Sequence, residues 1–480
     1  SSIIENVFGG GNGVSGAASA AHVGFHRISA TEKTAYTTGG SGKTYVNLVG
    51  GTITNVYGGS NSNGDIKNGT NILMPLKSAY SGTATLSSET CTLNATNIYG
   101  GGRNALMSSG TNIVLGCMPD SWIGEIYAGA ETADVGGDVS LTITSGKFER
   151  VFGGNKSSGL LKGSITVNIE ETTGNDCGVP IVIGELYAGG YEAGYSIYGY
   201  YQDTSDGNKW KPRTKELYDT WYASLDDDEK AKPENKPYSD PQLNVRAFTS
   251  IGAIYGGAYE AQLIGNPSID INVVKGSKAD NATLHNGTGD TYPAGTTGNL
   301  GLHYPEHKKG EIGAIGSVYG GGYSGDIIGN PSINIGTQTS VEFISEPTHL
   351  GTRNEDYTYN ATTKISTVPV QGANITGNVY GGGNAADIIG NATITIGTKD
   401  LTGTGKNGTK IGGDVFGGGF GPTTTVTGDV EVNIGANTGT DASPNYVGYA
   451  QITGSFYGGS AKGKVNATKS GTNPISYTQS

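Results

Sequence analysis

The chain has little cysteine, little histidine and little charge. Its 480 residues include 3 cysteines (Cys91, Cys117 and Cys177), too few and too scattered for a disulfide framework. The 6 histidines show no metal-ligand spacing such as His-x-x-x-His. Charged residues make up 15% of the chain, below the roughly 25% of ordinary soluble domains. These shortages disfavour a disulfide-stapled fold and a histidine metal centre.

The sign of the charge and the absence of long apolar runs exclude further classes. The formal net charge is −12, whereas nucleic acids and anionic membranes need a cationic face. No run of 18 apolar residues occurs, so we expect no membrane-spanning segment. Thr, Ser, Asn and Gly are typical of the surfaces of extracellular bacterial β-proteins, and we predict an extracellular or cell-surface location. The sequence starts at Ser1 without an initiator Met or signal peptide, as a mature or excised fragment would.

Glycine is abundant, at 83 residues, and it marks a tandem repeat. Eleven times an apolar residue precedes an aromatic residue and then Gly or Ala. Such an array must be interpreted as repeats before anything else. The aromatic positions are Phe8, Tyr57, Tyr99, Tyr127, Phe152, Tyr187, Tyr255, Tyr319, Tyr380, Phe416 and Tyr457.

Each repeat predicts three short strands separated by tight corners. The first strand carries the apolar-aromatic pair, the second carries Asp-Ile-Ile or its equivalent, and the third carries Ile-x-Ile. In the clearest copies, apolar residues fall nine, fourteen and sixteen positions after the aromatic, and the last two alternate as in a half-buried strand. We expect Ile254, Val318, Val379 and Val415 to point into one core. A second wall should contain Ile269/Ile271, Ile333/Ile335 and Ile394/Ile396.

A Gly-Asn dipeptide follows the second strand and predicts a corner. It occurs at Gly265-Asn266, Gly329-Asn330 and Gly390-Asn391. We expect the Asn266, Asn330 and Asn391 side chains to hydrogen-bond backbone groups there, because amides satisfy buried polar groups at turns. Compact copies take about 25 residues, so residues 1–480 are predicted to form one all-β solenoid: a right-handed parallel β-helix of about 11 coils. Cys91 and Cys117 lie about one coil apart, which allows a bridge, although buried free thiols are the commoner state.

Three segments interrupt the repeat. Residues 275–310 and 336–372 are predicted to be long loop insertions after the third strand. Residues 191–250 should form a docked helical excursion, with an amphipathic helix between Lys215 and Lys230 that a Pro-rich segment ends. The helix would present an apolar stripe of Leu217, Tyr218, Trp221, Tyr222 and Leu225.

The ring column is the first candidate for function. If the apolar residue of each pair points inward, the aromatic points outward, because side chains alternate along a strand. An exposed ladder of rings could stack on sugars. The commoner arrangement is that rings of adjacent coils stack on one another beneath the loops.

Metal binding and catalysis have weaker support. Asn61–Asp65 and Asp203–Asn208 are loops whose oxygens could hold Ca²⁺, and ordinary turn chemistry explains both. Gly321–Ile328 matches a calcium β-roll nonapeptide, which binds metal only when copies follow one another directly. No catalytic motif occurs, so we expect no cofactor, metal or enzyme activity. Carboxylates on neighbouring coils can nevertheless meet unseen in the sequence.

The repeat Val-Tyr-Gly-Gly-Gly-Asn-x-x-x-Ile-x-Gly-Asn-x-x-Ile-x-Ile resembles those of large surface proteins of gut bacteria, described as β-helix adhesins. The resemblance covers the chain except about residues 191–250 and implies a structural or adhesive role. Both ends carry repeat signature without an evident cap, so self-association end to end, or continuation in a longer polypeptide, is expected. The alternative is a polysaccharide-binding or polysaccharide-cleaving β-helix, such as a lyase or phage tailspike. A groove of carboxylates and basic residues across three coils would favour it.

Overall fold

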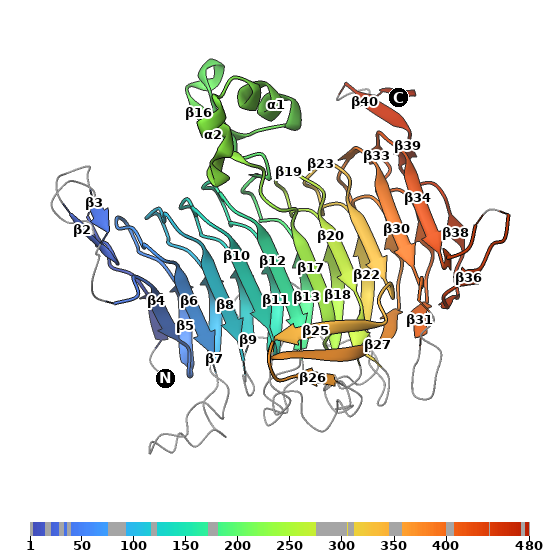
Figure 1. The fold of residues 1–480 in the computed structure, drawn as a ribbon, viewed down its shortest axis with the longest axis horizontal. Coiled ribbons are helices and arrows are strands. Elements are labelled where there is room, and N and C mark those ends of the chain that lie inside the picture. The colour runs from blue at the N-terminus through green and yellow to red at the C-terminus, as the bar shows by residue number, and fades with distance from the viewer. Residues whose placement is uncertain are drawn as a thin grey trace.

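The computed structural model is mostly β, as the repeat pattern predicts. It describes residues 3–14, 21–27, 33–35, 40–74, 93–116, 122–170, 181–274, 305, 312–344, 358–399, 408–440, 442–471 and 476–479. Strands make up 48% and helices 6%, and the strands form long parallel sheets. Figure 1 shows the strands of these sheets side by side along one elongated body, with the chain advancing from one end to the other.

The aromatic pairs lie in one continuous parallel sheet, which we call the aromatic sheet. Equivalent residues pair directly, so Val7, Val56 and Ile98 are aligned in one row and Phe8, Tyr57 and Tyr99 in the next. The strands follow the order β1 (Ile3–Phe8), β5 (Gly51–Tyr57), β7 (Leu93–Tyr99), β9 (Trp122–Tyr127), β11 (Gly146–Phe152), β13 (Ile181–Tyr187), β18 (Ser250–Tyr255), β22 (Ala314–Tyr319), β28 (Val379–Tyr380), β32 (Val415–Phe416) and β38 (Phe456–Tyr457).

Two further parallel sheets complete the body. The Ile-x-Ile segments form a ten-stranded sheet: β4 (Thr44–Asn47), β6 (Thr70–Met74), β8 (Thr111–Leu115), β10 (Val139–Ile143), β12 (Ile165–Glu170), β17 (Gln242–Ala247), β20 (Ser268–Ile271), β24 (Ser332–Ile335), β30 (Ala392–Ile396) and β34 (Val430–Ile434). The second strand of each repeat is short and forms a six-stranded sheet: β14 (Tyr195–Ser196), β19 (Leu263–Ile264), β23 (Ile327–Ile328), β29 (Ile388–Ile389), β33 (Thr425–Val426) and β39 (Lys464–Val465).

The core lies between the three sheets, and the two predicted walls are confirmed. Ile254, Val318, Val379 and Val415 are fully buried, as are the Ile-x-Ile pairs of β20, β24 and β30. In β23 and β29 of the short sheet, the residue that faces the core is the first of the two isoleucines, eight positions after the aromatic. Ile327 and Ile388 are fully buried, whereas Ile389 is 44% exposed. The sequence pattern gives an apolar residue at the ninth position of each copy, and Ile264 at that position is buried, but two consecutive apolar residues do not reveal which one faces the core.

The Asn corners join one coil to the next. The Asn266 Oδ1 accepts the N–H of Asn330 at 2.9 Å, and the Asn330 Oδ1 accepts the N–H of Asn391 at 2.9 Å. Asn391 in turn accepts the N–H of Asp429 at 2.9 Å. The glycine before each asparagine has a φ of 147–149°. A Cβ at Gly329 would also lie 2.0 Å from the Gly265 carbonyl oxygen, so coils approach too closely there for any side chain.

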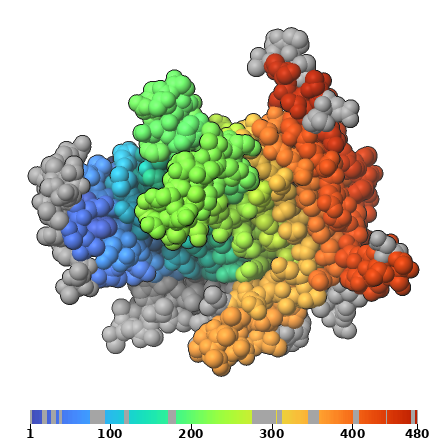
Figure 2. All heavy atoms as spheres, turned by 45° about the horizontal axis from the view of Figure 1, so that its top comes forward, coloured from blue at the N-terminus to red at the C-terminus, as the bar shows by residue number. Residues whose placement is uncertain are grey.

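The helical excursion projects from one side of the body, at the top of Figure 1 and in green in Figure 2. It contains the hairpin β15 (Tyr200–Asp203) and β16 (Lys209–Pro212), the 3-10 turns η2 (Thr204–Asp206) and η3 (Pro233–Asn235), and the helices α1 (Lys215–Ala223) and α2 (Asp227–Ala231). The single helix expected across 215–230 is therefore divided, because Asp226 caps α2 by accepting the N–H of Glu229. Tyr218 is buried, but Leu217 is 43% exposed, so the predicted apolar stripe is only partly used.

The insertion after β24 contains ordered strands where we expected a loop. The strands β25 (Ser340–Ile344) and β26 (Thr358–Asn360) pair antiparallel with the start of β27 (Ile365–Ile375). Val341, Phe343, Val368 and Val370 form a small separate core with Ala247 and Val274, because alternating apolar residues give the hairpin one buried face. The other insertion, 275–310, lies outside the described residues except Pro305, as do all three cysteines.

Two hairpins flank the sheets near the ends. The strands β2 (Phe25–Arg27) and β3 (Lys33–Ala35) pair antiparallel beside the first coil, and β40 (Ala467–Ser470) and β41 (Ser476–Gln479) do so near the last. Apolar side chains are exposed on the outermost described strands. Ile3 of β1 is 67% exposed, and Tyr457 of β38 is 47% exposed.

Candidate functional site

The outer face of the aromatic sheet brings together most of the predicted site residues. All eleven aromatic side chains, from Phe8 to Tyr457, form one unbroken column of parallel rings. Neighbouring centroids are 4.6–5.3 Å apart, with interplanar angles of 3–11°. The register of the parallel sheet imposes this column, because each ring is aligned with the equivalent ring of the next strand.

The faces of the inner rings of the column are not available to a ligand. Tyr127, Phe152 and Tyr187 are fully buried, and Tyr57 and Tyr99 are 1% exposed. Each inner ring has another ring on both faces, so a sugar could not stack on it. Burial raises the pKa of Tyr57, Tyr99, Tyr127, Tyr187 and Tyr255, and raises the pKa of Tyr319 to about 12. These hydroxyls therefore stay protonated at neutral pH.

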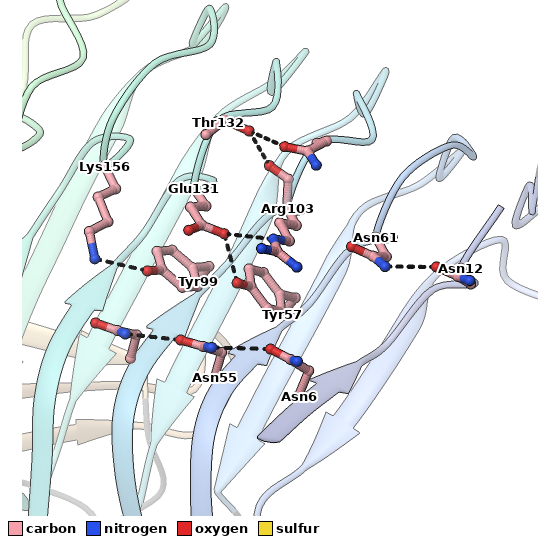
Figure 3. A network of polar contacts seen from close by, with 12 residues as sticks. Asn6, Asn12, Asn55, Tyr57, Asn61, Tyr99, Arg103, Glu131, Thr132 and Lys156 are labelled. Carbon is pink, nitrogen blue, oxygen red and sulfur yellow. Dashed lines mark hydrogen bonds and ion pairs between the residues drawn. The ribbon is translucent and has the colours of Figure 1, made fainter. Parts of the chain in front are cut away.

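A second column lies beside the rings, formed by the residue two positions before each of them, and it is polar in every coil except that of Tyr255, where it is Ala253. It begins with asparagines: the Asn55 amide donates to Asn6 at 3.1 Å, and the Asn97 amide donates to Asn55 at 2.9 Å (Figure 3). On the next three strands it becomes charged, with Glu125 on β9, Arg150 on β11 and Glu185 on β13. Arg150 lies between the two acids, with its Nε 3.0 Å from Glu185 and an Nη 3.6 Å from Glu125.

On these three strands, the ring carries a hydroxyl where the neighbouring charged residue can accept a hydrogen bond, and carries none where that residue is a cation. The Tyr127 hydroxyl donates to Glu125 and the Tyr187 hydroxyl donates to Glu185, both at 2.9 Å. The ring two residues after Arg150 is Phe152, which has no hydroxyl. The pattern Glu-x-Tyr, Arg-x-Phe, Glu-x-Tyr thus pairs every acceptor with a donor across three coils.

A third column lies at the corner, four residues after each ring, and covers the ring edges. Glu131 accepts the Tyr57 hydroxyl at 2.7 Å and lies 3.5 Å from Arg103 (Figure 3). The Lys156 ammonium donates to the Tyr99 hydroxyl at 3.1 Å and lies 3.5 Å from Glu125. Further along, Tyr191, Tyr259 and Tyr323 form a second stack with 4.7 Å between centroids.

Glu125, Arg150, Glu185, Arg103, Glu131 and Lys156 constitute the charged cluster. It holds three acids and three bases, and every acid has a cation within 3.6 Å. Burial opposes charge on Arg150, but attraction to Glu185 and neighbouring groups outweighs it and raises its pKa. No member is placed as a free general base or nucleophile, because each carboxylate already accepts hydrogen bonds. The cluster is suited to holding coils together.

The aspartates of the segments considered for Ca²⁺ binding have protein partners in the structure. Asp65 of the first candidate loop accepts the Ser108 N–H at 2.6 Å and contacts Lys33. In the second loop, Asp203 accepts the Lys211 ammonium at 2.8 Å and the Ser205 N–H at 2.9 Å, and these bonds lower its pKa to about 2. Asp326 accepts the Asp387 N–H at 2.8 Å. Protein donors thus engage these carboxylates, and within the described residues no three His, Cys, Asp or Glu side chains gather as a metal site would require.

Sequence reasoning missed the charged cluster. Its members are dispersed through the chain, and only the strand register unites them. The Glu-x-Tyr and Arg-x-Phe spacing on successive repeats is the signal from which it could have been found. Comparison with known proteins adds no identification: no family model, no curated protein and no solved structure matches this chain. Among the described residues, every helix is too short or too polar to cross a membrane.

Proposed function

We propose that this protein is an extracellular structural or adhesive surface protein, built as a right-handed parallel β-helix of about 11 coils. Its repeats resemble those of large surface proteins of gut bacteria, and that resemblance supports the location and the class. The observation that carries the proposal is the unbroken ring column. The chain commits its aromatic and charged outer face to contacts between coils, which stiffen a rod and leave few groups for chemistry.

The proposal includes assembly into an extended fibre, by stacking of copies or by further repeats of a longer polypeptide. The ring column reaches Phe8 on β1 and Tyr457 on β38, both on outermost strands of the described sheet. Phe456 and Tyr457 are 46% and 47% exposed. Unpaired strand edges and ring faces favour docking of another coil, and a head-to-tail contact of this kind propagates without closing.

Electron microscopy of the purified protein, with light scattering over a concentration series, tests this assembly. Fibres or concentration-dependent rods are expected. The matched variants are Tyr457→Asp, which places a charge in the column, and Tyr446→Asp, which changes a 78% exposed ring outside it. Fibres should shorten only in the first variant. Monodisperse single rods at every concentration would reject self-stacking.

The alternative is a polysaccharide-binding or polysaccharide-cleaving protein, which the charged cluster favours. The cluster brings acids and bases together on four adjacent coils, and clustered charges on neighbouring coils are the arrangement expected of such proteins on this architecture. Isothermal titration with neutral and acidic polysaccharides, using wild type and Arg150→Gln, distinguishes the two roles. Binding that the substitution abolishes, without loss of folded signal, would favour the alternative over the structural role.

A further inference from the structure

Four aspartates occupy the same position in different coils, immediately before the inward residue of the second strand. They are Asp65, Asp134, Asp326 and Asp387, followed by Ile66, Val135, Ile327 and Ile388. Each uses one carboxylate oxygen to accept a backbone N–H of the next coil, at 2.6–2.9 Å. The second oxygen is left for a side-chain partner, which is Lys33 at Asp65, Lys162 at Asp134 and Lys469 at Asp387.

Asp65 differs from the others in how completely it is enclosed. Its side chain is 2% exposed, and its second oxygen contacts both the Lys33 ammonium nitrogen and the Ser108 hydroxyl. Its own N–H donates to His22 Nδ1 at 2.9 Å. The Lys33 nitrogen also lies over the Phe25 ring, 4.7 Å from its centre, so the ring covers part of the amine. Lys33 and Phe25 both belong to the β2–β3 hairpin.

Enclosure changes the chemistry of this pair. Burial lowers the pKa of Lys33, because a desolvated ammonium is less stable than a neutral amine. A proton passing from the ammonium to the carboxylate leaves a neutral amine beside a neutral carboxylic acid. The neutral amine is a nucleophile, and the Ser108 N–H polarises the Asp65 carbonyl that it would attack.

We propose that Lys33 and Asp65 condense to an isopeptide bond, so that the hairpin is covalently attached to the second coil. The Lys33 Nζ forms a bond to the Asp65 Cγ, and the C–O bond to one carboxyl oxygen breaks. The departing oxygen leaves with two protons as water, and the third ammonium proton stays on the amide nitrogen. No oxidant or cofactor is needed, because neither atom changes oxidation state.

The cross-link fits the position of the hairpin. The strands β2 and β3 have three residues each, too few to be stable alone. Joining residues 33 and 65 removes chain entropy from the unfolded state and prevents the hairpin from detaching. Condensation also replaces a partly buried ion pair, in which the Asp65 carboxylate is desolvated, with a neutral amide.

The chain contains a matched comparison near its other end. Lys469 of β40 lies 2.5 Å from Asp387, so a hairpin lysine again meets an aspartate of the same column. The Asp387 side chain is more exposed, at 11%, and Lys469 also donates to the Thr423 carbonyl at 3.4 Å. Water and this carbonyl favour the charged ammonium, so this pair should remain an ion pair.

Intact-mass spectrometry of the denatured full chain tests the proposal. Wild type should be lighter than its sequence by one water, Lys33→Arg should have its full mass, and Lys469→Arg should keep the deficit. Tryptic mapping should join peptides 28–43 and 44–67 through Lys33 and Asp65. Fragmentation must locate the branch, because the uncut linear peptide has the same mass.

Wild type at full mass, with Lys33 and Asp65 in separate unbranched peptides, would overturn the cross-link. So would a deficit that persists in Lys33→Arg, since dehydration elsewhere would then explain it. The wild-type peptide map decides the question by itself if the arginine variant does not fold.

Discussion

At the scale of single residues, two apolar side chains of the same repeat can differ completely in burial. Val379 has no exposed surface, and Ile389, ten positions later in the same coil, is 44% exposed. We expect Val379→Asp to lower the free energy of unfolding by at least about 3 kcal/mol, because it leaves an unpaired charge among apolar neighbours. Ile389→Asp should cost little. Thermal melting of both variants checks this, and equal melting temperatures would contradict the core assignment.

Arg150 is the second residue whose removal should matter. Its side chain is 13% exposed and lies between two carboxylates. Arg150→Met should destabilise the protein by roughly 3 kcal/mol, because Glu125 and Glu185 lose the cation that compensates their burial. Arg150→Lys keeps the charge and should recover part of the loss. Chemical denaturation of the three proteins tests this, and equal stability of Arg150→Met and wild type would show that the cluster is not stabilising.

The buried tyrosines predict sensitivity to alkali. The folded-state pKa of Tyr319 is raised from 10.0 to about 12 by burial, so the fold favours its protonated form. That contribution to stability is fully present below pH 10 and is lost as the pH rises through about 12. We expect tyrosinate absorbance from the ring column to appear together with loss of the β-sheet circular dichroism signal. Ionisation of these tyrosines near pH 10 with the fold intact would contradict it.

At the scale of elements, the corners couple neighbouring coils. Asn330 is exposed, yet its oxygen accepts the Asn391 N–H. Asn330→Ala should cost about 1 kcal/mol, because water can partly replace the lost acceptor. Hydrogen exchange of the Asn391 amide should accelerate in Asn330→Ala and stay slow in Asn330→Asp, which keeps an acceptor oxygen. Equal exchange in all three proteins would show that the side chain contributes nothing.

The elements also show what sequence reasoning can reach. The two core walls and the ring column could be predicted, because their residues recur at fixed positions in every coil. The inward residue of the Asp-Ile-Ile strand could not, because both isoleucines are apolar. The strands β25 and β27 were missed inside a polar insertion, although Val341-x-Phe343 and Val368-x-Val370 carry the alternation of half-buried strands.

The candidate site was the least predictable part. Glu125, Arg150 and Glu185 meet only because β9, β11 and β13 pair in register. Lys33 and Asp65 meet because the β2–β3 hairpin lies against the second coil. The ring column was foreseen, together with the two uses open to it. Those uses were stacking on sugars and stacking of the rings on one another. The structure shows the second, since each inner ring is already covered on both faces by its neighbours.

At the scale of the whole molecule, insertions change the outline without disturbing the stack. The helical excursion and the β25–β27 hairpin project from the body in Figure 2, yet the rings before and after them stay stacked at 4.7–4.8 Å. We expect a short Gly-Ser linker in place of residues 340–370 to leave the melting temperature of the rod nearly unchanged, because Val318 and Val379 still pair. A drop as large as that of Val379→Asp would show that the hairpin is part of the core.

The corner hydrogen bonds have a direction, and this has a consequence for synthesis. In the chain Asp240, Asn266, Asn330, Asn391, Asp429, the earlier residue supplies the oxygen and the later one supplies the N–H. A folded coil therefore presents a side-chain oxygen that can accept a backbone N–H of the next coil as soon as that coil has been synthesised. Growth of the fold can follow the chain as it leaves a ribosome or a secretion channel, each turn serving as the template for the next. Released fragments that end at residue 399 should already protect the Asn391 amide, whereas fragments that end before residue 330 should leave the Asn266 side-chain oxygen without the Asn330 donor.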